Sequence, residues 1–119
     1  MLRGVRGAIQ VAENNRQAIL DCAGELMKAV IGKNHMQPEN VAAVFFTLTP
    51  DLNAAFPAEI RKTIGWNFVP FLCEQEVDVP GAMERVLRVL ILFETDLTQE
   101  QVSHAYLGAA ASLRPDLGK

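Results

Sequence analysis

The sequence has few of the side chains that bind metal ions or form disulfides. Its 119 residues contain two cysteines, Cys22 and Cys73, and two histidines, His35 and His104. The cysteines have no CxxC spacing and the histidines stand alone, so the pattern does not match a structural zinc site. Two cysteines are also too few for the disulfide framework of a small secreted protein. We therefore expect neither a metal site nor a disulfide scaffold.

Long apolar runs and clustered positive charge are also missing. No stretch approaches the roughly 20 apolar residues that a membrane-spanning helix needs. The net charge is −3, from 11 Lys and Arg against 14 Asp and Glu, and no basic cluster indicates a nucleic-acid surface. The N-terminal MLRGVRGAIQV has neither the long apolar core nor the cleavage site of a signal peptide. We expect a cytoplasmic protein that binds neither membranes nor nucleic acid, with a single domain over residues 1–119.

Arginine dominates the basic residues, with seven arginines against four lysines. The planar guanidinium matches a carboxylate in two parallel hydrogen bonds. Arg88 interrupts RVLRVLILF, an apolar run typical of a buried strand. Because a guanidinium keeps its charge at cellular pH, Arg88 must pair with an anion, either a carboxylate of the protein or a ligand. Composition alone favours these two readings about equally. The carboxylates that could form a salt bridge are Glu74, Glu76, Asp78 and Glu94.

Hydrophobic periodicity predicts a β-α-β unit in the first half of the chain. Residues 2–11 alternate as a half-buried strand does, and they place Arg6 on the face opposite Val5 and Ile9. The continuous apolar run VAAVFFTLT, residues 41–49, predicts a central strand that is covered on both faces.

Between these strands, residues 15–31 have the apolar spacing of an amphipathic helix. Asn14 or Asn15 can cap its start, and Gly32 can end it in a left-handed conformation.

The second half of the chain has shorter and weaker patterns. Residues 50–65 indicate a loop with short helical turns, and residues 66–73 indicate a strand near an edge or a bulge, because Pro70 cannot donate to a ladder. Arg88 lies in the next strand. The capping-box spacing TxxQ predicts a short helix that starts at Gln99. For AYLGAAASL, residues 105–113, both helix and strand fit, and we favour a strand.

These elements define an α/β (α+β) fold with a mixed β-sheet of four to five strands, one long helix and short helical turns. One long helix cannot cover both faces of such a sheet, so an apolar face would remain exposed in a monomer. Other copies of the chain are the natural cover. We therefore expect a homo-oligomer with sites at the seams between subunits.

Six segments of the chain match the pattern of one known family: RGVRGA (3–8), TPDLNAAFPA (49–58), GWNFVPFLCEQEVDVPG (65–81), RVLRVLI (85–91), HAYL (104–107) and LRPDL (113–117). In order and spacing they resemble the small trimeric α/β class of chorismate mutase. The likeness extends over nearly the whole chain, and the all-helical chorismate mutases have a helical pattern that is absent here. The resemblance implies a homotrimer shaped as a pseudo-α/β barrel, with active sites between neighbouring subunits.

The resemblance also implies the reaction and its residues. The enzyme would be an isomerase that rearranges chorismate to prephenate, on the route to phenylalanine and tyrosine, without a cofactor or metal. By this likeness Arg88 meets the ether oxygen, Glu76 accepts a hydrogen bond from the ring hydroxyl, and Arg6 holds a substrate carboxylate. The residues implied to line the substrate site are Cys73, Tyr106, Phe56, Ala58, Arg61, Phe71, Leu72, Leu113 and Arg114.

The chain departs from the family pattern near the mouth of the implied site. The stretch FPAEIRKTIG is one residue shorter than that pattern, and Glu59 stands where a basic side chain can occur. Both differences bear on the placement of Arg61. The sequence stops at Lys119, so a tail that could close over the site would be missing or reduced, and we expect substrate capture to be affected before chemistry.

Two other functions compete with a mutase. One is a trimeric deaminase of imines and enamines, which also uses an arginine to hold a carboxylate. The other is a non-catalytic module that binds amino acids or carboxylates, which would normally accompany a second domain. The CEQE segment followed by RVLRV matches the mutase pattern and favours it over both.

Overall fold

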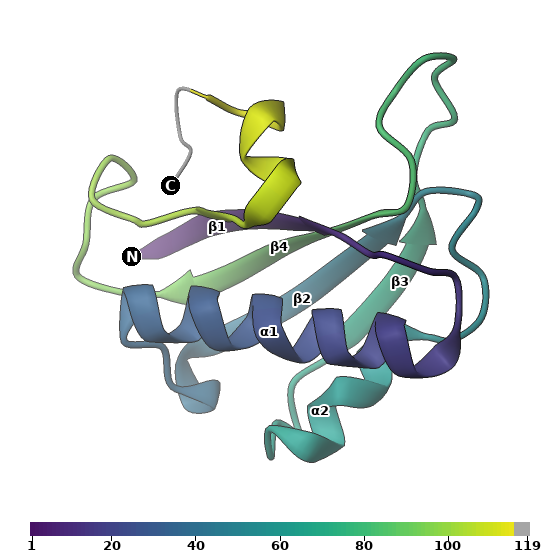
Figure 1. Ribbon diagram of the computed structural model, residues 1–119. Helices are drawn as coiled ribbons and strands as arrows, with labels where there is room; N and C mark the ends of the chain where they lie inside the picture. Colours follow the sequence, from purple (N-terminus) through teal and green to yellow (C-terminus); the bar gives the residue numbers. More distant parts are fainter. Residues whose placement is uncertain (116–119) are drawn as a thin grey trace.

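A five-stranded mixed sheet with one long helix across one face forms the fold (Figure 1). The computed structural model of the chain describes residues 1–115. The strands are β1 (Leu2–Gln10), β2 (Val41–Leu48), β3 (Phe71–Gln75), β4 (Val86–Glu94) and β5 (Ala105–Tyr106). The helices are α1 (Arg16–Asn34), α2 (Ile60–Thr63) and the 3-10 turns η1 (Pro38–Asn40), η2 (Pro57–Glu59) and η3 (Gly108–Leu113). The predicted mixed sheet with one long helix and short helical turns is confirmed.

The strand order is β3-β2-β4-β1-β5, so the strand that carries Arg88 lies in the centre. β4 is antiparallel to both β1 and β2, whereas β3 pairs parallel with β2 and β5 pairs parallel with β1. The predicted β-α-β unit is therefore present, but β4 lies between its two strands. β3 is an edge strand, as the proline before it indicated.

Helix α1 starts where the sequence predicted and ends later. The side chain of Asn15 accepts a hydrogen bond from the Ala18 amide at 2.8 Å and so caps the N-terminus. Gly32 lies inside the helix, and His35 is the left-handed residue with φ 51°. The helix continues because the buried side chain of Asn34 is hydrogen-bonded to the backbone of Ser103. Its Nδ2 donates to the Ser103 carbonyl at 2.9 Å, and its Oδ1 accepts from the Ser103 amide at 2.8 Å.

Glycine lets β5 and α1 approach β1 closely. A Cβ atom on Gly7 would lie 2.7 Å from the Ala105 carbonyl oxygen and 3.0 Å from Cδ1 of Leu26. Since real Cβ atoms do not approach a backbone oxygen so closely, only glycine fits here. The main core then forms between α1 and the sheet, with fully buried Val5, Leu26 and Phe46.

Three local predictions in the second half were wrong. The strand expected over 66–73 begins only at Phe71, because residues 66–70 form turns that bury Trp66 and Val69. Thr98 and Gln101 form both hydrogen bonds of a capping box, but the segment is a single turn and not a helix.

Of the strand expected over residues 105–113, only Ala105–Tyr106 is a strand in the structure. Gly108, with φ +55°, then turns the chain into η3. The last part of the LRPDL segment and the chain end at Lys119 lie outside the described residues.

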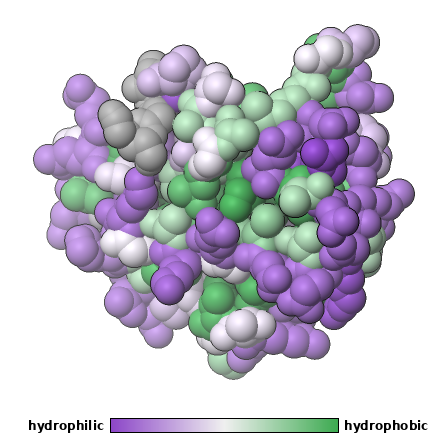
Figure 2. Space-filling model, viewed as in Figure 1, coloured by the Kyte–Doolittle hydropathy of each residue, from purple (hydrophilic) through white to green (hydrophobic). Residues whose placement is uncertain are grey.

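The face of the sheet opposite α1 is only partly covered. Of β2, only the face with Val44, Phe46 and Leu48 is buried, so the expected cover on both faces is absent in the single chain. On the other face Phe45 is half-buried and Leu90 is 36% exposed. On the side that carries α1, by contrast, hydrophilic side chains predominate around the periphery (Figure 2). None of the described helices is both long and apolar enough to cross a membrane.

Candidate active site

The sheet register places Arg88 in a row of side chains on the face opposite α1. Residues paired across neighbouring strands point to the same face. Arg88 pairs with Ala8 in β1 and with Thr47 in β2. Ala8 in turn pairs with Tyr106, and Thr47 pairs with Glu74. The register alone therefore brings Tyr106 and Glu74 to the two ends of the row that has Arg88 at its centre.

A groove of about 440 Å³ on this face brings together the three residues predicted to be catalytic, Arg88, Glu76 and Arg6. Arg6 reaches it from β1, because it lies two residues before Ala8 and so points to the same face. Three of the five other lining residues are apolar. The other lining residues are Phe45, Thr47, Glu74, Val89 and Leu90.

The carboxylate of Glu76 is the anion that meets Arg88. Nε of Arg88 lies 2.7 Å from Oε2 of Glu76, and the two side chains are 27% and 28% exposed. This is an ion pair without the angle of a hydrogen bond, since the buried Nε has no hydrogen-bond partner among the described residues. The Thr47 hydroxyl donates to Oε2 at 3.4 Å, and the Val77 amide donates to Oε1 at 3.1 Å. Glu76 is thus held from two sides while it faces Arg88.

The Tyr106 hydroxyl is the second buried polar group at this row that has no hydrogen-bond partner among the described residues. The residue is 1% exposed, and within residues 1–115 its hydroxyl has no hydrogen-bond partner. Its ring packs in a small cluster with Ala8, Val86 and Ala110, and Leu113 packs against the same cluster. Buried hydroxyls are normally hydrogen-bonded, so this one is suited to bind a ligand.

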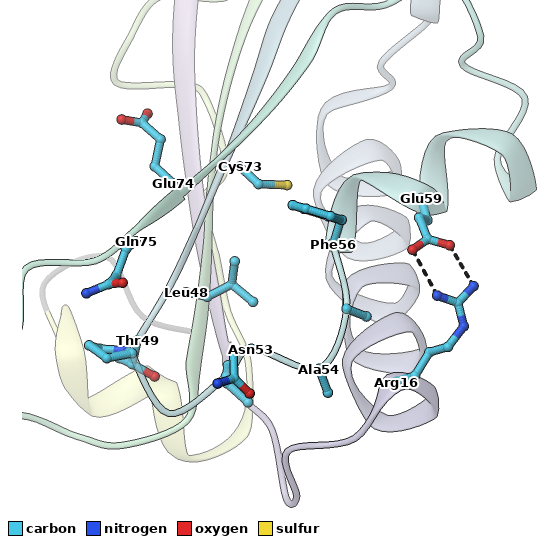
Figure 3. Close-up of a pocket in the computed structure, with 13 residues that line it drawn as sticks. Arg16, Leu48, Thr49, Asn53, Ala54, Phe56, Glu59, Cys73, Glu74 and Gln75 are labelled. Carbon is cyan, nitrogen blue, oxygen red and sulfur yellow. Dashed lines mark hydrogen bonds and ion pairs between the residues drawn. The ribbon is translucent and has the colours of Figure 1, made fainter.

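Two of the remaining predicted residues, Phe56 and Cys73, lie at a second cavity on the α1 side of the edge strand. This cavity of about 490 Å³ is lined by Phe56 and Cys73 together with Arg16, Glu59 and Glu74 (Figure 3). Phe56 is 72% exposed, and its ring lies toward the Cys73 thiol. Burial raises the pKa of that thiol, although a hydrogen bond with the Ala58 backbone acts in the opposite direction. At neutral pH Cys73 is therefore protonated, which suits contact with substrate and not nucleophilic attack.

The other predicted residues line neither the groove of Arg88 nor the cavity of Cys73. Arg61 follows Ala58 on the segment of η2 and α2, whereas Leu72 is 52% exposed on the face of β3 opposite Cys73. Phe71 contacts the core, with its ring centroid 6.1 Å from that of Phe46. Arg114 directly follows η3 and is half-buried. A single chain therefore brings Arg88, Glu76 and Arg6 together but leaves Phe56, Ala58 and Cys73 on the other side of β3.

Comparison with known proteins identifies the family to which this site belongs. A family model described as chorismate mutase type I matches residues 2–117, which is nearly the whole chain. The chain belongs to the type I chorismate mutase family. The resemblance noted in its six segments is thereby confirmed, and as a family member the chain is an isomerase.

Two curated relatives and one solved structure give the extent of the similarity to other type I chorismate mutases. The chain is 42% identical over 118 residues to chorismate mutase AroH of Bacillus subtilis (strain 168), covering 98% of this chain and 93% of the relative. It is 49% identical over 118 residues to chorismate mutase AroH of Thermus thermophilus, covering 98% and 97%. The solved chorismate mutase from Clostridium thermocellum superimposes with a TM-score of 0.88 at 34% identity, over 90% of this chain and 96% of that one.

Two features of this candidate site were not found from the sequence. Thr47 contacts Glu76 from the row of Arg88; the signal was available, because Thr47 is the one polar residue in VAAVFFTL. The second is the ion pair of Arg16 with Glu59, which joins residues 43 positions apart. No local pattern marks such a contact.

Proposed function

We propose that this chain converts chorismate to prephenate in the groove that holds Arg88, Glu76 and Arg6, and that the Arg88 guanidinium is its main catalytic group. The observation that carries this proposal is the place of Arg88: a fixed cation in the centre of a sheet, open to a groove, in a member of the chorismate mutase family. Membership of the family supports the reaction, and the groove supports the assignment of the residues that carry it out.

A Claisen rearrangement makes demands that this groove can meet. The reaction is intramolecular and transfers no proton to the enzyme, so geometry and charge must provide the acceleration. A catalyst of ordinary power lowers the barrier by at least about 8 kcal/mol. Part comes from holding the enolpyruvyl arm folded over the ring in a reactive conformation. As the ether bond stretches, its oxygen gains negative charge, and a preorganised cation stabilises that charge more than it stabilises the substrate.

The other groove residues divide the remaining tasks. Glu76 orients Arg88 through the 2.7 Å contact and presents a second carboxylate oxygen that can accept from the ring hydroxyl. Arg6 supplies a cation for one substrate carboxylate. Tyr106, which lies beside Ala8 in the row of Arg88, has a hydroxyl without a hydrogen-bond partner among the described residues that can donate to the same carboxylate. Charge on the enzyme is thus complementary to a dianionic substrate with one hydroxyl.

The two walls of the site come together between subunits of a homotrimer. In one chain the wall of Phe56, Ala58 and Cys73 lies on the opposite side of β3 from Arg88, so a neighbouring copy must supply it. The half-covered face with Phe45 and Leu90 supports such an assembly, because a second subunit would bury it. We propose that the trimer acts in the cytoplasm, in the biosynthesis of aromatic amino acids.

The direct test is to mix purified protein with chorismate and follow the loss of its ultraviolet absorbance. Prephenate is then confirmed by its conversion to phenylpyruvate in acid. Saturable conversion without added metal or cofactor is the expected result. A folded oligomer that leaves chorismate unchanged would contradict the proposal and favour a carboxylate-binding protein without rearrangement.

The shared site is tested by mixing two inactive variants. Arg88→Ala would disable the wall of Arg88, Glu76 and Arg6, and Arg61→Ala would weaken the segment that carries Phe56 and Ala58. Hybrid trimers formed by joint refolding would contain some sites with neither substitution. Activity well above that of either parent is expected from the mixture. If both walls came from one subunit, mixing the variants would restore no activity.

A further inference from the structure

Arg16 and Glu59 form a bidentate ion pair at the cavity that carries Phe56 and Cys73. Nη1 of Arg16 lies 2.9 Å from Oε2 of Glu59, and Nη2 lies 2.6 Å from Oε1 (Figure 3). Arg16 is the first residue of α1, and Glu59 is the last of η2, so the pair joins two separate elements. Two parallel hydrogen bonds fix the carboxylate in one orientation more strictly than a single contact would.

The pair contributes at most modestly to stability. The two side chains are 61% and 38% exposed. Exposed ion pairs are screened by water and salt, and even well-aligned ones contribute only modestly to folding. Replacing Arg16 should therefore leave the fold intact, so that a role of the pair in the cavity can be tested separately.

The charge of the cavity indicates that purpose. Two carboxylates, Glu59 and Glu74, line it, and Arg16 is the only cation in its lining. Arg16 hydrogen bonds most strongly lower the pKa of Glu59, and Lys62 and Arg61 lower it further, so Glu59 is ionised at neutral pH. An ionised carboxylate here would repel a dianionic substrate.

Arg61 is the second reason that Glu59 needs a fixed partner. It is close enough to Glu59 to lower the pKa of that carboxylate, and within residues 1–115 no carboxylate forms an ion pair with it. If Arg16 did not hold Glu59, the carboxylate could turn to Arg61 and occupy a guanidinium that the family resemblance implies lines the substrate site.

We propose that Arg16 is a positioning residue for substrate capture: it neutralises Glu59 and keeps that carboxylate away from Arg61. This rests on the proposed function of the site.

The test is a double-mutant cycle on steady-state kinetics with chorismate at low and high salt. Arg16→Gln should raise KM by roughly three- to tenfold and leave kcat within about twofold, and the effect should shrink at high salt. Arg16→Gln with Glu59→Gln should return KM to the wild-type value or below, because no charge is left to neutralise. Arg16→Lys should rescue KM in part. Lys28→Gln is the matched control, since it removes the same charge from an exposed position on the same helix.

The outcomes separate this inference from the proposed function. Equal impairment of the single and the double variant would overturn the positioning role, because Arg16 would then act without Glu59. Wild-type KM in Arg16→Gln would also overturn it while leaving the mutase function intact. A wild-type protein that does not turn over chorismate would overturn both.

Discussion

Nε of Arg88 lies 2.7 Å from Oε2 of Glu76, and this contact joins the centre of the sheet to the end of its edge strand. A partly buried ion pair is weak evidence for stability, because the two charges lose much of their hydration when they are brought together. Its value here is geometric. The guanidinium is held at one place before substrate arrives, so little reorganisation remains when charge develops in the transition state.

Arg88→Ala should leave the oligomer folded and lower kcat by roughly a hundredfold to a thousandfold, the range for loss of one preorganised donor. Arg88→Lys keeps the charge but loses the planar fork, and we expect it to recover only part of the rate. Circular dichroism and sedimentation are the controls for folding. Near-normal turnover in the folded fraction of an unstable Arg88→Ala protein would show that Arg88 is structural.

Glu76→Gln should weaken catalysis less than the loss of Arg88. It removes a charged contact, and such contacts contribute about 1.5 to 3 kcal/mol, which corresponds to about ten- to a hundredfold in kcat/KM. Because Glu76 orients Arg88, we expect kcat at saturating chorismate to fall as well as KM to rise. A change in KM alone would limit Glu76 to recognition of the substrate.

Tyr106→Phe should separate binding from folding. The hydroxyl has no hydrogen-bond partner among the described residues, so its removal should change the free energy of unfolding by less than about 0.5 kcal/mol. KM for chorismate should rise, because a donor to the substrate is lost. Chemical denaturation and steady-state kinetics measure the two effects. A clear loss of stability with unchanged KM would show that the hydroxyl serves the fold.

Cys73 and Cys22 should react slowly with iodoacetamide at neutral pH and faster as pH rises above 9. Burial raises the pKa of both thiols from the ordinary value of 9.0, so the reactive thiolate is scarce until the solution is more alkaline. Chorismate or a stable dicarboxylate analogue should protect Cys73, which lines the cavity, and leave Cys22 unaffected. Mass spectrometry of labelled peptides reads both sites. Equal labelling of Cys73 with and without ligand would remove it from the substrate site.

Gly7→Ala should destabilise the protein by about 1 to 3 kcal/mol, the usual cost of overpacking, because its Cβ would meet the backbone of Ala105 at 2.7 Å. Gly4→Ala is the control, since its Cβ would make only ordinary contacts of 3.6 Å with Leu90 and Leu92. Thermal unfolding of both variants measures the difference. Equal stability of the two would contradict the close approach of β5 to β1.

The contrast between confirmed and wrong local predictions has a common cause. The strand of residues 2–11 and the helix after Asn15 have many regularly spaced apolar residues. Each pattern repeats often enough to predict its element without information from the rest of the fold. Gly32 and the TxxQ box at Thr98 are single signals. A glycine can remain inside a helix when a later residue has tertiary support, as Asn34 has from Ser103. A capping box can close one turn without a helix behind it.

The sequence by itself determined the strand and helix pattern, the need of Arg88 for an anion, and the resemblance to the chorismate mutases, because these depend on neighbouring residues and on short motifs. Which carboxylate meets Arg88 was decided by the tertiary structure. Glu94, a candidate on the same strand, pairs with the N-terminal amine of Met1 at 3.1 Å, whereas Glu76 reaches Arg88 from the position directly after β3, across β2. Such partners are selected by the register of strands that are distant in sequence, and no local pattern specifies that register.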